Sequence, residues 1–464
     1  MLDDVQWSGA SGTVAPSIRR WAACFLGAHA LLSCGADPQP DTFSREPLLD
    51  PATCTSCHAT HVKEWSGSMH AYAADDPVFL AMNRRGQRET GGALGDFCVR
   101  CHAPMAVAEG LTTDGLNLSE LPSEKKGVTC YFCHNALAVQ GTHNNPIQLA
   151  HDTTLRGAIR DPIKNPVHGS AHSALLDRES LASSDLCGAC HDVVNGHGVA
   201  LERTFLEWKA TIFNSPDPET ALTCGKCHMT GSPGAVATFE RAPVRRLHEH
   251  TFAGVDVALG PWPEKEAQRA AILRDLNPTV LARMCVAAVD SGVRVDISLE
   301  NGMAGHMWPS GAAQDRDAWV ELVAYAGGKV LFQSGLVAEG QSLAEVPGED
   351  LWRLGDKMFG EQGEPVHMFW EAKSVESNLL PPIVTRDPSD PRYYHAVTRY
   401  YRIAQAVPDR ITLKVHLRPF KMELLESLIA SGDLAPEVKA QVPTFTLAGT
   451  ELEWTPAVGF QCVR

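Results

Sequence analysis

The stretch Gly127-Val-Thr-Cys-Tyr-Phe-Cys-His134 carries a Cys-x-x-Cys-His motif, and the same motif occurs five times between residues 54 and 228. The cysteine pairs are Cys54/Cys57, Cys98/Cys101, Cys130/Cys133, Cys187/Cys190 and Cys224/Cys227, and the histidines that follow them directly are His58, His102, His134, His191 and His228. Two thiols at this spacing can add across the vinyl groups of one haem, and the adjacent histidine then lies under the iron as its proximal ligand. A single Cys-x-x-Cys could instead be a redox pair or half of a zinc site. Five copies in one chain predict five covalently bound haem c groups.

The segments between the motifs are irregular in length, so the chain is not an array of equal repeats. They are rich in loops, with short helices expected at residues 76–85 and 201–211. Few apolar side chains are available for each motif, so the macrocycles themselves are expected to form much of the core. The sequence therefore predicts a mainly α-helical and irregular pentahaem cytochrome domain over residues 54–268.

The N-terminus has the features of a secretory signal. Arg19-Arg20 precede an apolar run that ends at Leu31-Leu32-Ser33-Cys34 and is too short for an ordinary membrane span. The last four residues resemble a bacterial lipobox, which predicts a lipoprotein signal peptide over residues 1–33, lipid attachment at Cys34 and a flexible tether over 34–53. The alternative is a general signal peptide that contains a cysteine by coincidence. Because Gly35 and not an acidic residue follows Cys34, we expect anchoring in the cell envelope at the outer membrane, facing the periplasm or the exterior.

Composition limits the classes of partner. The chain has 464 residues, 44% hydrophobic and 20% charged, which suits a soluble globular protein of two or three domains. The formal net charge of −15 argues against nucleic acid or an anionic membrane surface as partner. It favours redox protein partners with basic surfaces, and it leaves the oligomeric state open.

The pattern changes after the motif region. A helical connector is expected at 269–284 and an antiparallel β-sandwich domain at 285–464, because residues 293–299, 318–325 and 411–417 alternate between apolar and polar side chains. Gly327-Gly328 between two such runs predicts a β-hairpin. Helices are expected at 421–431 and 435–441. Cys285 and Cys462 bracket this domain, so we expect a disulfide between them in an oxidising compartment; two buried thiols are the alternative.

Several segments resemble a known family. Glu64-Trp-Ser-Gly-Ser-Met-His-Ala71, Asp76-Pro-Val-Phe79, Gly127–His134, Leu186–Asp192, Cys224–Met229 and His250-Thr-Phe-Ala-Gly254 are similar to the multihaem cytochrome c family. Its best-known members are the tetrahaem cytochromes of ammonia oxidisers, electron carriers of hydroxylamine oxidation. The resemblance covers about residues 54–254 and implies that His70 and His250 are distal haem ligands. This chain has five motifs where those relatives have four, and it has a C-terminal β-domain.

Gly305-His-Met-Trp-Pro-Ser-Gly311 resembles an element that follows the haem region in longer members of the family. That resemblance makes His306 a candidate distal ligand, with a structural loop histidine as the alternative.

Other histidines are candidates from their place in the chain. The full set of distal candidates is His70, His250, His168, His143 and His306, of which His143 and His168 lie in polar turn sequences between motifs. Nearby alternatives to these are His151, His172, His197 and His248. His61 is expected to be a surface residue or to bind a neighbouring haem, and His367, His395 and His416 are expected to be structural. Met105 and Met229 could bind iron through sulfur, although packing roles are expected for both.

Three functions remain open from the sequence. An electron relay requires every iron to have two axial ligands, and we expect this function, with no catalytic residue. The alternative is a multihaem oxidoreductase that acts on a small nitrogen or sulfur compound at one haem with an open position. The third is an assembly role in which the β-domain docks onto a partner.

Overall fold

The computed structural model describes residues 43–464 apart from 240–241, 347, 349, 405 and 460. The predicted signal peptide (1–33) and Cys34 lie outside the described residues. Residues 41–464 form one compact unit. No helix within the described ranges is both long enough and apolar enough to cross a membrane.

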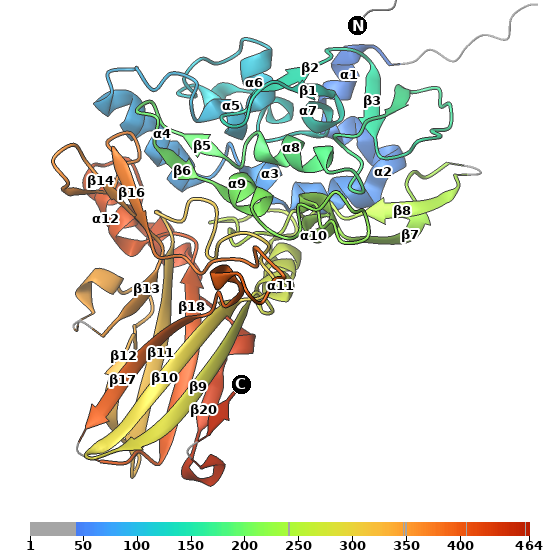
Figure 1. Cartoon of the computed structure of the whole chain (residues 1–464). Helices are drawn as coiled ribbons and strands as arrows, with labels where there is room; N and C mark the ends of the chain where they lie inside the picture. Colours follow the sequence, from blue (N-terminus) through green and yellow to red (C-terminus); the bar gives the residue numbers. More distant parts are fainter. Residues whose placement is uncertain (1–42, 240–241, 347, 349, 405, 460) are drawn as a thin grey trace, which may run out of the picture. The chain divides into compact units, whose positions relative to one another are not determined.

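The motif region consists of short helices and small sheets. The helices are α1 (Arg45–Leu49), α2 (Pro51–Ser66), α3 (Met69–Tyr72), α4 (Pro77–Glu89), α5 (Val99–His102), α6 (Pro104–Ala108), α7 (Cys130–His134), α8 (Ala182–Gly188), α9 (Thr204–Lys209) and α10 (Cys224–His228). The strands are β1 (Ala136–Val139), β2 (Ile147–Leu149), β3 (Thr154–Gly157), β4 (Gly169–His172), β5 (Val193–Val194), β6 (Ala200–Glu202), β7 (Gly231–Ala235) and β8 (Val244–His248), each paired with one other strand. Figure 1 shows these short elements apart from the long strands of the C-terminal part.

Local chemistry explains why the motifs form helical turns. Thr129 and Thr223 stand just before α7 and α10, and their hydroxyls accept from the backbone N–H groups of Phe132 and Lys226. Each hydroxyl satisfies one of the free N–H groups at a helix start. Asp50 caps α2 in the same way.

Part of the predicted tether is ordered. Residues 45–49 form α1, and α2 begins at Pro51. The reason is apolar burial: Leu48 and Leu49 are buried in a cluster with Met105 and Tyr131. The prediction of a flexible segment over 34–53 is therefore wrong for its second half. The same cluster gives Met105 the packing role expected for it.

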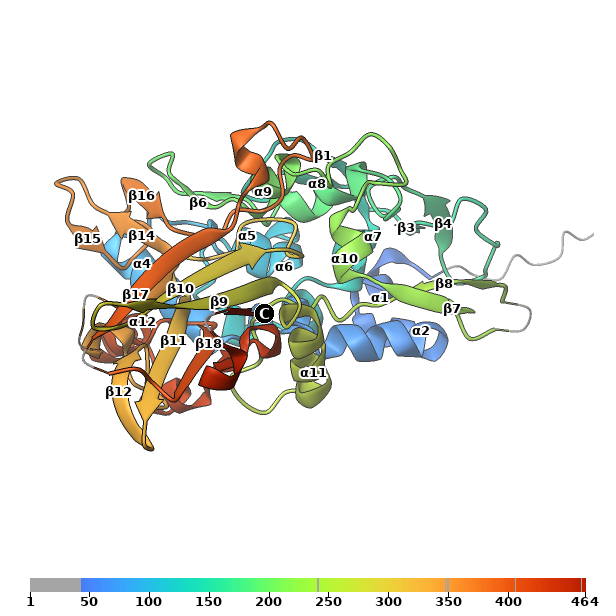
Figure 2. The ribbon, with the colours of Figure 1, turned by 60° about the horizontal axis from the view of Figure 1, so that its bottom comes forward.

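The C-terminal part contains two large antiparallel sheets. The first has the order β17 (Val397–Ala404), β10 (Gly292–Asn301), β9 (Val280–Val289), β21 (Cys462–Val463). The second has the order β12 (Lys329–Ser334), β11 (Asp317–Ala326), β18 (Arg410–Arg418), β19 (Phe445–Thr446), with β13 (Trp352–Leu354) on β11 and β20 (Leu452–Trp454) on β18. A small third sheet contains β15 (Pro365–Val366), β14 (Asp356–Phe359) and β16 (Ser374–Ser377). Figure 2 shows β17, β10 and β9 side by side.

The two large sheets share one hydrophobic core, which contains Val295 and Ile297 from β10, Leu322 from β11 and Leu413 and Val415 from β18. The alternating residues seen in the sequence are those that point into this core. Gly327 and Gly328 both have positive φ, at 57° and 77°, and form the turn between β11 and β12, as predicted.

Some boundaries differ from the predictions. The connector helix α11 is Lys265–Leu276, and residues 280–284, predicted as helix, belong to β9. Pro278 ends the helical run, and the alternating burial of the following residues, Val280 onward, suits a strand. The stretch 201–211 divides into β6 and α9, whereas α12 (Met422–Ala430) lies where expected and 436–441 is a 3₁₀ helix.

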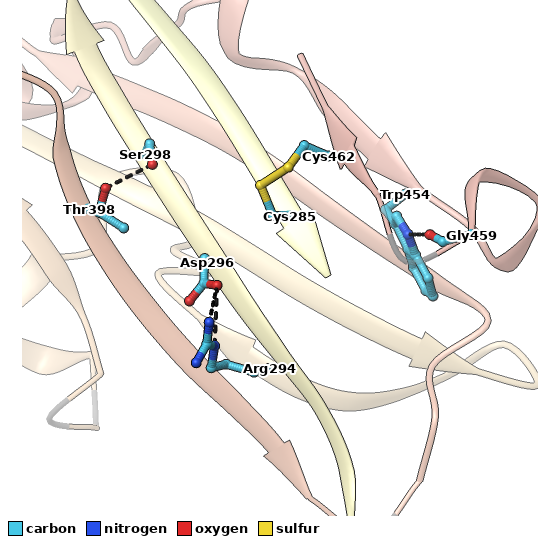
Figure 3. The surroundings of a disulfide bond; sticks show 8 residues. All are labelled: Cys285, Arg294, Asp296, Ser298, Thr398, Trp454, Gly459 and Cys462. Carbon is cyan, nitrogen blue, oxygen red and sulfur yellow. Dashed lines mark hydrogen bonds and ion pairs between the residues drawn. A yellow bond between two sulfur atoms is a disulfide. The ribbon is translucent and has the colours of Figure 1, made fainter. Parts of the chain in front are cut away.

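Cys285 and Cys462, the pair singled out in the sequence, are joined by a disulfide across β9 and β21 (Figure 3). The bond closes a loop with a sequence separation of 177. It attaches the C-terminal strand to the sheet through a covalent link, where β21 itself has only two residues.

Partly buried ion pairs and hydrogen bonds connect the motif region to the β-sheets. The Arg316 guanidinium binds both carboxylate oxygens of Asp256 at 2.8 and 3.0 Å. Arg203, just before α9, pairs with Asp356 at the start of β14 at 3.2 Å. Asn195 donates to the carbonyls of Phe369 and Ala372, both at 2.9 Å. These contacts bring the β-region loops against the motif region.

Candidate haem-binding sites

The five motifs are numbered here as sites 1 to 5 in chain order. In every site the Nδ1 atom of the motif histidine has a protein acceptor. The pairs are His58 with Val236 O (2.7 Å), His102 with Ala73 O (2.9 Å), His134 with Arg156 O (2.6 Å), His191 with Glu202 Oε1 (3.1 Å) and His228 with Ala253 O (3.0 Å). An imidazole that donates from Nδ1 has its free lone pair on Nε2, the atom that binds a metal. The donor set therefore fits proximal haem ligation.

Three of these histidines face a second histidine at a definite spacing. The ring centroids are 6.5 Å apart for His58 and His168, 6.4 Å for His134 and His250, and 6.3 Å for His191 and His70. If a metal–nitrogen bond is about 2.0 Å and the centroid lies about 1.1 Å behind the nitrogen, two imidazoles on one metal have centroids about 6.2 Å apart. The three pairs have the spacing that one iron between them requires.

The distal candidates of these pairs are also prepared for ligation. His168 and His250 use Nδ1 on the carbonyls of Gly169 (2.8 Å) and His248 (2.9 Å). Burial lowers the pKa of both His70 and His250 to about 3, so each ring is neutral at physiological pH. A neutral imidazole is the form that binds a metal. The ring of Phe252 lies 4.5 Å from that of His70 and 5.6 Å from that of His250, and fills the space between them.

His306 is the distal candidate nearest to site 5. Its Nδ1 lies 2.9 Å from Met307 O, and burial together with the charge of His228 lowers its pKa to about 4. Glu207 of α9 fixes the loop that carries it, because the carboxylate accepts from Met307 N and from the Ser310 hydroxyl, both at 3.1 Å. This arrangement explains how a residue of the Gly-His-x-x-Pro-Ser-Gly element comes back to the motif region.

Site 2 differs from the others. Within the described part of the chain, the ring contact of His102 is with Phe79, whose centroid is 4.0 Å away and whose plane is parallel within 2°. The remaining candidate, His143, is exposed on a loop, and its Nδ1 lies 3.0 Å from the Thr142 hydroxyl. A ligand role for His143 stays a prediction.

The other histidines have different surroundings. His172, His197 and His416 use Nε2 in hydrogen bonds to Asp177, the Trp370 carbonyl and Glu321 at 3.1, 3.1 and 3.2 Å. His151 contacts Arg45, His395 contacts the Asn301 carbonyl, and His367 is exposed. The ring of His61 lies only 4.7 Å from that of His250, which is too close for a shared iron. The pKa of His248 is lowered mainly by burial.

The cysteine thiols show which sites are neighbours. The side chains of three cysteine pairs are close enough to affect each other's pKa, namely Cys54 with Cys130, Cys101 with Cys190 and Cys187 with Cys224. These contacts join site 1 to site 3, site 2 to site 4 and site 4 to site 5. Cys133 of site 3 also interacts electrostatically with Cys187 and Cys190 of site 4. Site 4 is therefore next to three other sites.

Cys57, the second cysteine of site 1, differs from the cysteines that link neighbouring sites. Its thiol is free, and the sulfur accepts a hydrogen bond from the hydroxyl of the adjacent Ser56 at 3.8 Å. Its backbone carbonyl accepts from Thr238 N at 2.7 Å, two residues beyond the Val236 carbonyl that holds His58. The segment between β7 and β8 thus positions both Cys57 and His58, whereas the expected thioether bond from Cys57 to haem stays a prediction.

The remaining motif cysteines, Cys98 of site 2 and Cys227 of site 5, are also free thiols. Burial raises the pKa of Cys98 to about 12 and also raises the pKa of Cys227. Both therefore stay protonated at physiological pH. Their covalent attachment to haem, like that of Cys57, is expected from the motif.

Sequence reasoning missed Glu202, the acceptor for His191. It lies 11 residues after His191, on β6, where Val193 of β5 pairs with it. The Asn195-Gly-His-Gly198 turn between the two strands was a signal that could have predicted this hairpin. Burial lowers the pKa of His191, but the hydrogen bond to the Glu202 carboxylate and its charge raise this pKa by more. The net result is a pKa of about 9.

Comparisons with known proteins agree with this geometry. Residues 53–135 match the cytochrome c554 and c-prime family. The penta-heme cytochrome c552 from Thermochromatium tepidum has a similar fold, with a TM-score of 0.62 and 20% identity over 88% of this chain and 98% of that chain. No curated protein sequence matches significantly. The family match at residues 53–135 and the similar fold thus make the chain similar to multihaem c-type cytochromes.

Proposed function

We propose that the chain is an extracytoplasmic pentahaem cytochrome that relays electrons between closely packed haems. Each haem, when bound, supplies a one-electron Fe(III)/Fe(II) couple. The observation that carries the proposal is the spacing of three histidine pairs at 6.3, 6.4 and 6.5 Å. Two nitrogen ligands leave an iron with no free position, which suits electron transfer and not substrate chemistry.

The protein's own groups perform three tasks in this proposal. The Nδ1 acceptors hold each proximal ring in the tautomer that offers Nε2. Burial of the distal rings keeps them neutral. The positions of the motif cysteines place neighbouring sites side by side in the order 1, 3, 4, with branches from site 4 to sites 2 and 5.

A haem count tests the proposal directly. A pyridine haemochrome assay after acid–acetone extraction is expected to give five haems per chain that stay with the protein. Low-temperature paramagnetic resonance is expected to show low-spin signals for the sites with two histidines. A count of four or fewer, or a mainly high-spin spectrum, would contradict a five-haem relay.

We also propose how the relay is held in place. Residues 1–33 act as a signal peptide, Cys34 carries lipid, and the two C-terminal sheets form a β-sandwich domain against which redox protein partners dock. Cys34→Ala is expected to move the protein from the outer-membrane fraction to the soluble periplasm. Unchanged fractionation would contradict the lipid anchor and leave the relay unaffected.

A second function is favoured by the surroundings of site 2. Among the described residues, His102 packs against Phe79, and no ring contact with a second imidazole is found. A site without a second axial ligand could bind a small nitrogen or sulfur compound and transfer electrons to or from it. The reduced protein is then expected to bind one carbon monoxide per chain. If it binds none, site 2 has a sixth ligand and the relay alone remains.

A further inference from the structure

Site 4 has a charged acceptor where the other four sites have a neutral one. The motif histidines of sites 1, 2, 3 and 5 each use Nδ1 on a backbone carbonyl. His191 alone uses it on a carboxylate, that of Glu202 at 3.1 Å. Pairing of β5 with β6 places Glu202 beside His191.

The Arg316 guanidinium lies close to Glu202. A methyl group built on Gly311 would lie 3.2 Å from Arg316 Nη2 and 3.9 Å from Glu202 Oε1, so the guanidinium and the carboxylate lie on the same side of this glycine. The guanidinium is held in place by its two bonds to Asp256.

A carboxylate draws the Nδ1 proton more strongly than a carbonyl does, because the hydrogen bond is charge-assisted. The imidazole then becomes a more basic ligand at Nε2. A more basic axial ligand, next to a full negative charge, stabilises Fe(III) over Fe(II) and lowers the reduction potential.

We propose that Glu202 is a positioning residue that lowers the reduction potential of site 4, the branch point of the relay. The inference rests on the proposed function, since it concerns haem at site 4. The motif cysteines of site 4 lie beside those of sites 2 and 5, and Cys133 of site 3 interacts with Cys187 of site 4. An electron that reaches a branch point of lowered potential is passed on to its neighbours and is not stored there.

The test compares three variants of the full, haem-loaded protein by redox titration and paramagnetic resonance. Glu202→Gln keeps the size of the side chain and an acceptor oxygen but removes the charge. Glu202→Asp keeps the charge. Glu437→Gln removes a charge from an exposed residue of the 3₁₀ helix at 436–441, away from the sites, and serves as the matched control.

In Glu202→Gln, one of the five midpoint potentials is expected to rise while four stay unchanged, and one low-spin signal is expected to shift its g values. Glu202→Asp is expected to restore the potential at least in part, and Glu437→Gln to change nothing. Five unchanged potentials in Glu202→Gln, or an equal shift in Glu202→Asp, would overturn the inference. A haem count below five in the unmutated protein would instead contradict the proposed function.

Discussion

Replacing His70 with alanine removes one of the two imidazoles whose centroids lie 6.3 Å apart at site 4. The site keeps Cys187, Cys190 and the proximal His191, so the haem stays attached and one axial position becomes free. The expected change is one iron per chain, from low spin to high spin or water-bound. The carbon monoxide bound by the reduced protein is expected to rise by one per chain.

The assay is a carbon monoxide titration followed by optical absorption, alongside paramagnetic resonance of the oxidised protein. Added imidazole is expected to fill the free position and reverse both changes. His367→Ala is the matched control, because His367 is exposed and is not among the distal ligand candidates. If His70→Ala gains no carbon monoxide and stays low spin at site 4, then His70 is not the distal ligand, and the spacing argument fails for this pair.

Three further outcomes are expected. Replacing both Cys285 and Cys462 with serine is expected to lower the free energy of unfolding of the β-region by up to about 5 kcal/mol, because the disulfide closes a loop with a sequence separation of 177. Urea denaturation measures this loss, and an unchanged midpoint would contradict it. Burial raises the pKa of Asp76 from 3.8 to about 6, so the folded state binds this proton more tightly and stability falls as pH rises from about 4 to 6, by up to about 3 kcal/mol. Asp76→Asn is expected to remove that part of the pH dependence in thermal melts. A pH profile identical to that of the unmutated protein would contradict the raised pKa of Asp76. Gly127→Ala is expected to destabilise the protein and disturb site 4, because Gly127 has φ of +66° and the added Cβ would lie 2.6 Å from the carbonyl oxygen of His70; a normal spectrum and melting temperature would show that the loop adapts.

The sequence predicted the features that depend on local chemistry. Each Cys-x-x-Cys-His motif predicts its own cofactor attachment within five residues, and this attachment stays a prediction. The alternation in Val293–Leu299 predicted β10, because strand burial has a period of two residues. Gly327-Gly328 predicted its hairpin for the same kind of local reason.

The pairing of histidines could not be predicted in this way. His70 lies soon after site 1 in the chain but faces His191 of site 4, and His250 faces His134 of site 3. Such pairs depend on how distant segments pack, and spacing along the chain carries no information about it. The resemblance to a known family implied that His70 and His250 are ligands, but it did not say which haem each one would serve. The helix at 45–49 was missed because its stability comes from tertiary contacts of Leu48 and Leu49, and a segment rich in Pro and Asp gives no sign of them.

The Nδ1 acceptors also differ in whether a point mutation can remove them. A backbone carbonyl is present whatever side chain its residue carries, so point substitutions at Val236, Ala73, Arg156 or Ala253 leave the acceptor in place. Glu202 is a side chain, and a single codon change can remove, shorten or neutralise it. Four sites are thus buffered against mutation at this position. Site 4, at the branch point, is the site whose reduction potential evolution or protein engineering can adjust by changing a single residue.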